Sequence, residues 1–256
     1  MRKITVRGDD DFSSMHIEME RLERLDIHGG LHLTDDSDIR GLRNMRVRGS
    51  FDSGTLGLFG DDSARVRIDG NVSTGTILNV AGGSLDVRGD VEGTINLDNA
   101  RKADIRGSLA GGTLNFTNAD STRLNVRGDA RDGATISVES SMKEIMLGSL
   151  LESAIYMGLR NWGGGLPGSF SQFDAPDSVL ERLTIKGSTS GSTIVAPHIE
   201  RLDLGRLSDA ATTHVAAGSV EEARFTAADN LRYLLRDGSL FSNAPELPYL
   251  DLVELT

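Results

Sequence analysis

Apolar and polar residues alternate in a short motif that recurs along most of the chain. The motif is apolar–x–apolar–x followed by glycine, and successive glycines lie 18 to 21 residues apart. Full copies end at the following residues: Gly8, Gly29, Gly49, Gly70, Gly89, Gly107, Gly128 and Gly187. Two copies carry the glycine one place early, at Gly148 and Gly205, and Gly168 keeps the spacing where the motif itself is degraded. This regularity predicts a repeat protein with a unit of about 20 residues.

A second apolar segment follows most of these glycines. It begins with threonine, continues with Ile or Leu, and ends on another apolar residue two places later, as at 94–97, 113–116 and 135–138. Both segments alternate with period two and favour Val, Ile and Thr, which is typical of short strands. No stretch within 1–220 carries the apolar stripe of a helix. The pattern therefore predicts an all-β protein, a single-stranded parallel β-helix (β-solenoid) with about 20 residues per coil and about 10–12 coils.

A leucine-rich repeat has a similar period and is the alternative fold. Its first leucine is present before the motifs at 25–29 and 183–187, but Ala100 and Ser121 replace it in central repeats. The central repeats also carry a threonine strand where that fold would place a helix. These differences favour the β-solenoid.

Glycine and proline depart from average usage in opposite directions, which fits stacked coils. The chain has 30 glycines among 256 residues but only 5 prolines, and the first is Pro167. A proline within a stacked strand would remove a hydrogen bond between coils. We expect the repeated glycines to occupy corners that need a positive φ. The second apolar residue of each motif is expected to fill the interior: Val6, Ile27, Val47, Ile68, Val87, Ile105, Val126 and Ile185.

The repeat divides the chain into two parts. We expect a β-solenoid over 1–218, with an irregular coil or loop at 158–176, and a C-terminal irregular coil or cap over 219–256. The segment 229–237 ends before Gly238 and is predicted as a short helix. The irregular segment contains three aromatic candidates for a binding site: Trp162, Phe170 and Phe173. Two interpretations stay open, an aromatic contact platform on a loop and a degraded coil whose rings fill a wider interior.

Charge and cysteine content narrow the class of partner. Acidic residues outnumber basic ones, 38 to 27, which gives a net charge of −11 and disfavours nucleic acid as a partner. The chain has no cysteine and therefore no disulfide or thiolate metal site. It lacks an apolar run long enough for a transmembrane helix, and its first residues lack the apolar region of a signal peptide. A cell-surface or extracellular location is expected if the chain is part of a longer exported protein, and a cytoplasmic one otherwise.

No catalytic or metal-binding motif stands out, so we expect neither an enzyme nor a cofactor. Instead, the outward position before each glycine forms a basic column with four candidate binding residues: Arg48, Arg88, Arg106 and Arg127. A partly acidic column, which includes Asp26, Asp86 and Asp104, is expected beside it. These columns predict either a surface lattice of ion pairs or a track for an extended anionic polymer.

The complete repeat, as in VRGDVEGTINL at 87–97, resembles the right-handed parallel β-helix repeats of large bacterial surface proteins, including adhesin-like and autotransporter-passenger-like chains. The resemblance covers about residues 1–215 and implies a right-handed coil and a surface-exposed or exported scaffold of structure or adhesion. Expected partners are an anionic polysaccharide or another protein. The alternatives are a self-assembling cytosolic filament similar to bactofilins, with end-to-end association, and a β-helix polysaccharide lyase or hydrolase.

Overall fold

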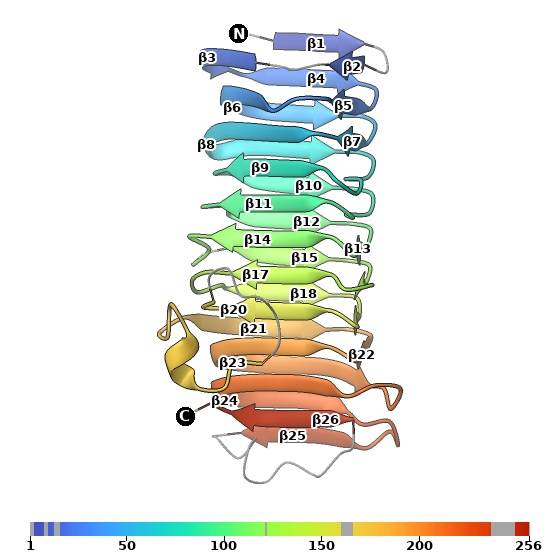
Figure 1. Cartoon of the computed structure of the whole chain (residues 1–256), viewed down its shortest axis with the longest axis vertical. Coiled ribbons are helices and arrows are strands. Elements are labelled where there is room, and N and C mark those ends of the chain that lie inside the picture. Colours follow the sequence, from blue (N-terminus) through green and yellow to red (C-terminus); the bar gives the residue numbers. More distant parts are fainter. Residues whose placement is uncertain are drawn as a thin grey trace.

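The chain forms a rod of stacked coils, an all-β parallel β-solenoid of about 10 turns with about 21 residues per turn (Figure 1). The computed structural model describes residues 3–7, 10–12, 16–120, 122–159, 166–236 and 249–255. Strand β1 lies at one end of the rod, and β25 and β26 lie at the other (Figure 1). The predicted fold class is therefore confirmed.

Most coils contribute strands to three columns, and at Val72 and Val91 the third column has isolated bridges instead of strands. The strands that carry the apolar–x–apolar–x–glycine motif form what we call the tetrad sheet: β1 (Lys3–Arg7), β4 (Arg24–His28), the second part of β6 (Ser37–Val47) and of β8 (Thr55–Ile68), β10 (Ser84–Val87), β12 (Lys102–Ile105), β15 (Arg123–Val126), β18 (Glu144–Leu147), β21 (Val179–Ile185), and the second part of β23 (Thr193–Leu207) and of β24 (Thr213–Thr226).

The threonine-led strands form a second column, which we call the threonine sheet: β3 (His16–Leu22), the first parts of β6 and β8, β9 (Ile77–Ala81), β11 (Thr94–Asp98), β14 (Thr113–Thr117), β17 (Thr135–Val138), β20 (Ala154–Met157), the first parts of β23 and β24, and β26 (Leu250–Glu254). A third column is made of short strands: β2 (Asp10–Phe12), β5 (Leu31–Leu33), β7 (Phe51–Ser53), β13 (Leu109–Ala110), β16 (Ala130–Arg131), β19 (Leu150–Leu151) and β22 (Ser188–Ser190).

The interior is a continuous apolar core that runs the length of the rod. Parallel register places equivalent residues of successive coils side by side, as in Val87, Ile105 and Val126. The predicted inward residues from Ile27 to Ile185 are at most 2% exposed, and Val6 at the end of the rod is partly buried. Alternation in each strand sends the intervening polar residues outward.

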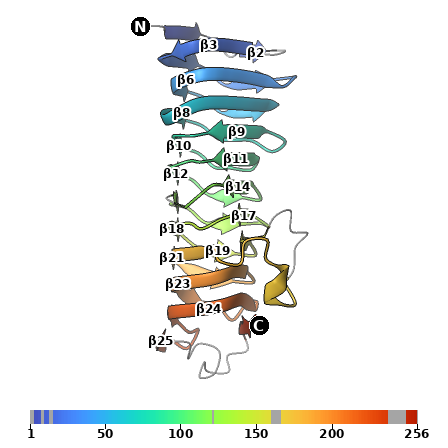
Figure 2. The same cartoon turned by 90° about the vertical axis from the view of Figure 1, so that its left-hand side faces the viewer.

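The segment 158–176 is an insertion rather than a coil, which corrects the role given to Gly168. Leu147 pairs directly with Ile185, so one coil contains all the residues between β18 and β21. The described part of the insertion includes a short 3₁₀ helix, η1 (Phe170–Gln172), and lies beside the lower coils (Figures 1 and 2). The spacing that Gly168 keeps in the sequence reflects the length of the insertion and does not mark a coil.

Phe170 and Phe173 of the insertion pack on the outside of the threonine sheet and do not fill the interior. Phe173 is 6% exposed and clusters with Leu159, Val195 and Ala216. Phe170 is half-buried, and its ring centroid lies 5.5 Å from that of Phe173. Trp162 lies outside the described residues. The outward residues of these coils are apolar, and the insertion covers them.

The helix predicted over 229–237 is wrong. Residues 232–236 form β25 (Arg232–Arg236), which pairs antiparallel with the end of β24. The ring of Tyr233 stacks on that of Phe225, with centroids 5.0 Å apart, while Leu234 on the other side of the strand is 50% exposed. The open edge of β24 supplies hydrogen-bond partners that the local sequence does not reveal. Because β24 runs from 213 to 226, the expected boundary at 218 also falls within a strand.

The corner glycines are required by close stacking rather than by a positive φ. The amide of Gly128 donates to the carbonyl of Gly107 at 3.0 Å, and that of Gly148 donates to Gly128 at 2.9 Å. A Cβ on Gly128 would lie only 2.7 Å from the carbonyl oxygen of Gly107. Of the glycines in this column, Gly205 has a positive φ, whereas Gly107 and Gly128 do not. Each corner therefore excludes side chains because it rests directly on the corner of the preceding coil.

We expect Gly128→Ala to lower the free energy of unfolding by about 1–3 kcal/mol, because the new methyl group pushes two coils apart. Gly168→Ala is the matched control, since a Cβ there would meet only Gln172 at 3.8 Å. Urea unfolding followed by circular dichroism measures both variants. Equal midpoints for the two variants would contradict the stacking requirement.

Candidate functional site

The outer surface of the tetrad sheet is densely charged. The register places its side chains in columns, and two of them carry the predicted charges. The column nearest the glycines holds the predicted basic residues, and from Arg48 to Lys186 its backbone amides donate to carbonyls of the preceding coil. From one end of the rod, this glycine-side column reads Arg7, His28, Arg48, Asp69, Arg88, Arg106, Arg127, Gly148 and Lys186. The middle column reads Thr5, Asp26, Arg46, Arg67, Asp86, Asp104, Asn125, Met146, Thr184, Asp203 and Arg224.

The four candidate arginines lie in one column, but not without interruption. Asp69 separates Arg48 from Arg88, whereas Arg88, Arg106 and Arg127 are consecutive. Phe170 and Phe173 pack on the threonine sheet, so the structure does not bring them together with these arginines. The predicted arginine track and the predicted aromatic platform are therefore separate surfaces.

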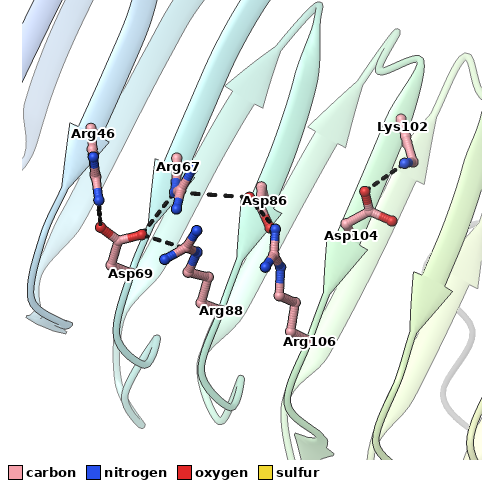
Figure 3. Close-up of polar contacts among 8 residues, drawn as sticks. All are labelled: Arg46, Arg67, Asp69, Asp86, Arg88, Lys102, Asp104 and Arg106. Carbon is pink, nitrogen blue, oxygen red and sulfur yellow. Dashed lines mark hydrogen bonds and ion pairs between the residues drawn. The ribbon is translucent and has the colours of Figure 1, made fainter.

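A lattice of ion pairs joins the first two columns between β6 and β12 (Figure 3). Asp69 is its centre: it accepts from Arg46 Nε at 2.7 Å and from Arg67 Nε at 2.7 Å, and Arg88 Nε lies 3.3 Å away. Asp69 is only 12% exposed, because these guanidinium groups cover it. One carboxylate thus holds together the arginines of three successive coils.

The lattice continues along the rod through the middle column. Arg106 Nε lies 3.3 Å from Asp86 Oδ1, and Lys102 Nζ lies 2.6 Å from Asp104 (Figure 3). Among the described residues, Arg48 and Arg127 have no ion pair with a carboxylate. The structure therefore contains the predicted lattice, and it neutralises Arg88 and Arg106 more than Arg48 and Arg127.

Five arginines converge in a groove of about 450 Å³ on this sheet, near the end formed by β1. The groove is lined by Arg24, Arg43, Arg46, Arg65 and Arg67, with Glu23, Asp26, Asn44 and Met45. Five guanidinium groups thus face two carboxylates in a chain of net charge −11. We call this surface the basic groove.

The sequence analysis did not predict the basic groove, because its arginines lie outside the position before each glycine. Four of its arginines occupy the other outward positions of the strands. Arg24 and Arg65 lie one place before the motif, and Arg46 and Arg67 are the second residue of the motif. The signal was present in the motif Met45-Arg-Val-Arg, which carries arginine at both outward places. Only the register shows that these side chains meet those of neighbouring coils.

Asp26 at the floor of the basic groove is a buried carboxylate. It is 2% exposed, and its Oδ2 lies 2.9 Å from Arg24 Nε and 3.5 Å from Lys3 Nζ. Burial raises its pKa, but the hydrogen bond and charge of Arg24, with the charge of Lys3, outweigh burial and hold the pKa below its usual value. Its Oδ1 has no hydrogen-bond partner among the described residues. Asp26 is thus ionised and fixes the position of Arg24.

The opposite end of the same face carries equal numbers of acidic and basic side chains. A second groove of about 370 Å³ is lined by Glu144, Glu181, Glu200 and Glu221, which alternate with Arg123, Lys143, Arg182 and Arg201. Arg182 Nη1 lies 3.5 Å from Glu144. The charged face therefore changes character along the rod, from an excess of arginine near β4 to balanced charge near β23.

No protein-family model, curated protein or solved structure matches this chain. In the part of the chain that the structure describes, no helix has the length and hydropathy needed to span a membrane. The described residues also contain no group of three or more His, Asp and Glu side chains placed to hold a metal ion.

The ionised state of Asp69 stabilises the fold. Burial raises its pKa, but hydrogen bonds from Arg67 and Arg46 outweigh burial and lower the pKa below the usual aspartate value. A lowered pKa in the folded state stabilises the protein above the pKa of the unfolded chain, and this contribution is lost as the pH falls through the folded pKa.

We expect Asp69→Asn to reduce the free energy of unfolding by about 1–2 kcal/mol at neutral pH, because three guanidinium groups lose their counter-charge. The difference from the wild type should shrink as the pH falls through the acid range. Asp132→Asn is the control, because Asp132 pairs with Arg131 but is 61% exposed. A constant difference at all pH values, or an equal effect of the control, would contradict a stabilising role for the Asp69 charge.

Proposed function

We propose that the chain is a non-enzymatic scaffold of structure or adhesion that binds an anionic polymer along its charged face. The observation that supports this function is the basic groove, where five arginines gather on an otherwise acidic protein. Guanidinium groups bind carboxylate and sulfate oxygens through paired hydrogen bonds. An anionic polysaccharide of a cell surface is a ligand of this kind, and a surface or exported location would suit it.

The spacing of the coils favours a polymer over a small anion. Neighbouring strands are about 4.8 Å apart, so arginines on successive coils offer binding groups in a row. Arg43 and Arg65 line the groove without an ion pair among the described residues, whereas Arg46 and Arg67 are engaged by Asp69. An anion that binds Arg43 and Arg65 breaks no existing ion pair, so these two residues should contribute most to its affinity. The glutamates at the far end disfavour binding there, so the polymer would occupy the half nearest β1.

Two alternative functions lead to different observations on the purified protein. A self-assembling filament would appear as long rods by negative-stain electron microscopy, with end-to-end contacts between coils. A polysaccharide lyase or hydrolase would shorten the bound polymer over time. A scaffold that binds without turnover and stays dispersed supports the proposal over both.

We expect dextran sulfate and polygalacturonate to bind the protein with an affinity that falls as salt is added, because the charges are exposed and screened. The double variant Arg43→Ala/Arg65→Ala should weaken binding about tenfold or more, a loss of about 1.4 kcal/mol. Isothermal titration calorimetry measures both. Arg201→Ala in the charge-balanced groove at the far end of the same face is the control. No binding of either polymer, or equal weakening by the control, would refute the proposal.

A further inference from the structure

A second groove, of about 600 Å³, lies on the threonine sheet, away from the charged face. It crosses the outer surface of β9, β11, β14 and β17, whose stacked strands are visible in Figure 2. Its lining combines amides, hydroxyls, two carboxylates and three aromatic rings, and it includes no lysine or arginine. None of these residues belongs to the basic groove, so the two surfaces are independent.

The floor of this groove is a ladder of asparagine side chains. Asn79, Asn96 and Asn115 are neighbours in register, and Asn96 Nδ2 donates to Asn79 Oδ1 at 2.6 Å. Asn115 Nδ2 donates to Asn96 Oδ1 at 2.8 Å. A side-chain amide has two N–H donors, so each rung keeps a second N–H after the ladder is formed. The ladder fixes the amides and presents donors at intervals of about 4.8 Å along the rod.

An aromatic ring closes the end of the groove nearest β1. Phe59 is 39% exposed, and its ring lies over Gly57, where a Cβ would be 2.9 Å from Phe59 Cε2. The guanidinium of Arg40 covers one side of the ring, 5.0 Å from its centroid. The next residue in the same column is Ala81, which is too small to cover the other side. The side of the ring that faces the groove is thus open.

A tyrosine and the insertion close the other end. Tyr156 follows Ser137 in the asparagine column and is half-buried. Beyond it the column becomes apolar, with Val195 and Ala216, and Phe170 and Phe173 of the insertion pack there. Phe59 and Tyr156 are five coil steps apart, about 24 Å. The open floor between two rings is long enough for several units of an extended chain.

The carboxylates that line this groove favour a neutral polymer over an anionic one. Asp98 and Glu139 line the groove, and Thr113 and Thr135 stand in the outward column on the other side of the asparagines. Carboxylates accept hydrogen bonds from hydroxyl groups but repel anions. Aromatic rings bind the C–H faces of sugars, and amides exchange hydrogen bonds with their hydroxyls.

We infer that this groove binds a neutral oligosaccharide in an extended conformation, with its sugar rings on Phe59 and Tyr156 and its hydroxyl groups on the asparagine ladder. This site is separate from the proposed anion-binding site and does not depend on it.

The test is calorimetric titration with neutral hexasaccharides: cello-, xylo-, manno-, malto- and chito-oligosaccharides. We expect at least one to bind with a Kd below about 1 mM, and its disaccharide to bind at least tenfold more weakly. Phe59→Ala and Asn96→Ala should each weaken binding about fivefold or more, a loss of about 1 kcal/mol. Asn125→Ala is the matched control, an outward asparagine of similar burial on the tetrad sheet that donates to Asp104 at 3.3 Å. Circular dichroism checks that each variant is folded.

Three results would overturn the inference. They are no binding of any hexasaccharide at a concentration of about 1 mM, binding that Phe59→Ala and Asn96→Ala leave unchanged, and binding that Asn125→Ala weakens equally. The Arg43→Ala/Arg65→Ala variant separates the two sites. It should bind the neutral oligosaccharide as the wild type does, even if the anionic polymer fails to bind the wild type at all.

Discussion

Direct stacking of one coil on the next is the constraint on which the structure depends. Hydrogen bonds between corner glycines, such as Gly107, Gly128 and Gly148, hold successive corners in contact and leave no room for a Cβ. The polar residue that follows several of these glycines strengthens the same contact; for example, the amide of Asp90 donates to Asn71 Oδ1 at 2.9 Å. Because the corners cannot shift, the strands between them stay in parallel register along the rod.

Because the register is fixed, the sequence repeat places equivalent side chains next to one another on the surface. Equivalent residues of neighbouring coils lie about 4.8 Å apart, so each outward position becomes a column whose members must tolerate one another. Asparagine satisfies this requirement by itself, because the amide of Asn96 both donates and accepts. Arginine does not, and in one coil Asp69 takes its place and accepts hydrogen bonds from Arg46 and Arg67. The two sheets therefore carry different surfaces on one scaffold.

The insertion at 158–176 shows how a departure from the repeat can be accommodated. A solenoid has little room to change its interior, since every coil must match its neighbours. The described residues of the insertion, among them Phe173, accordingly leave the coil and pack outside it, against an apolar surface formed by Val195 and Ala216. This packing also ends the polar part of the threonine sheet at Tyr156. The insertion thus sets the length of the surface that stays open.

The sequence by itself determined the fold class, the strands of the regular coils and the residues that fill the interior, because alternation and period are local signals. It also placed Arg48, Arg88, Arg106 and Arg127 in one column. Only the tertiary structure decided the path of 158–176, the strand at 232–236 and the partners of each charge. These depend on which coils touch, as do the basic groove around Arg43 and Arg65 and the ladder at Asn96. The repeat determines which side chains each coil presents, whereas the contacts between coils determine which residues those side chains touch.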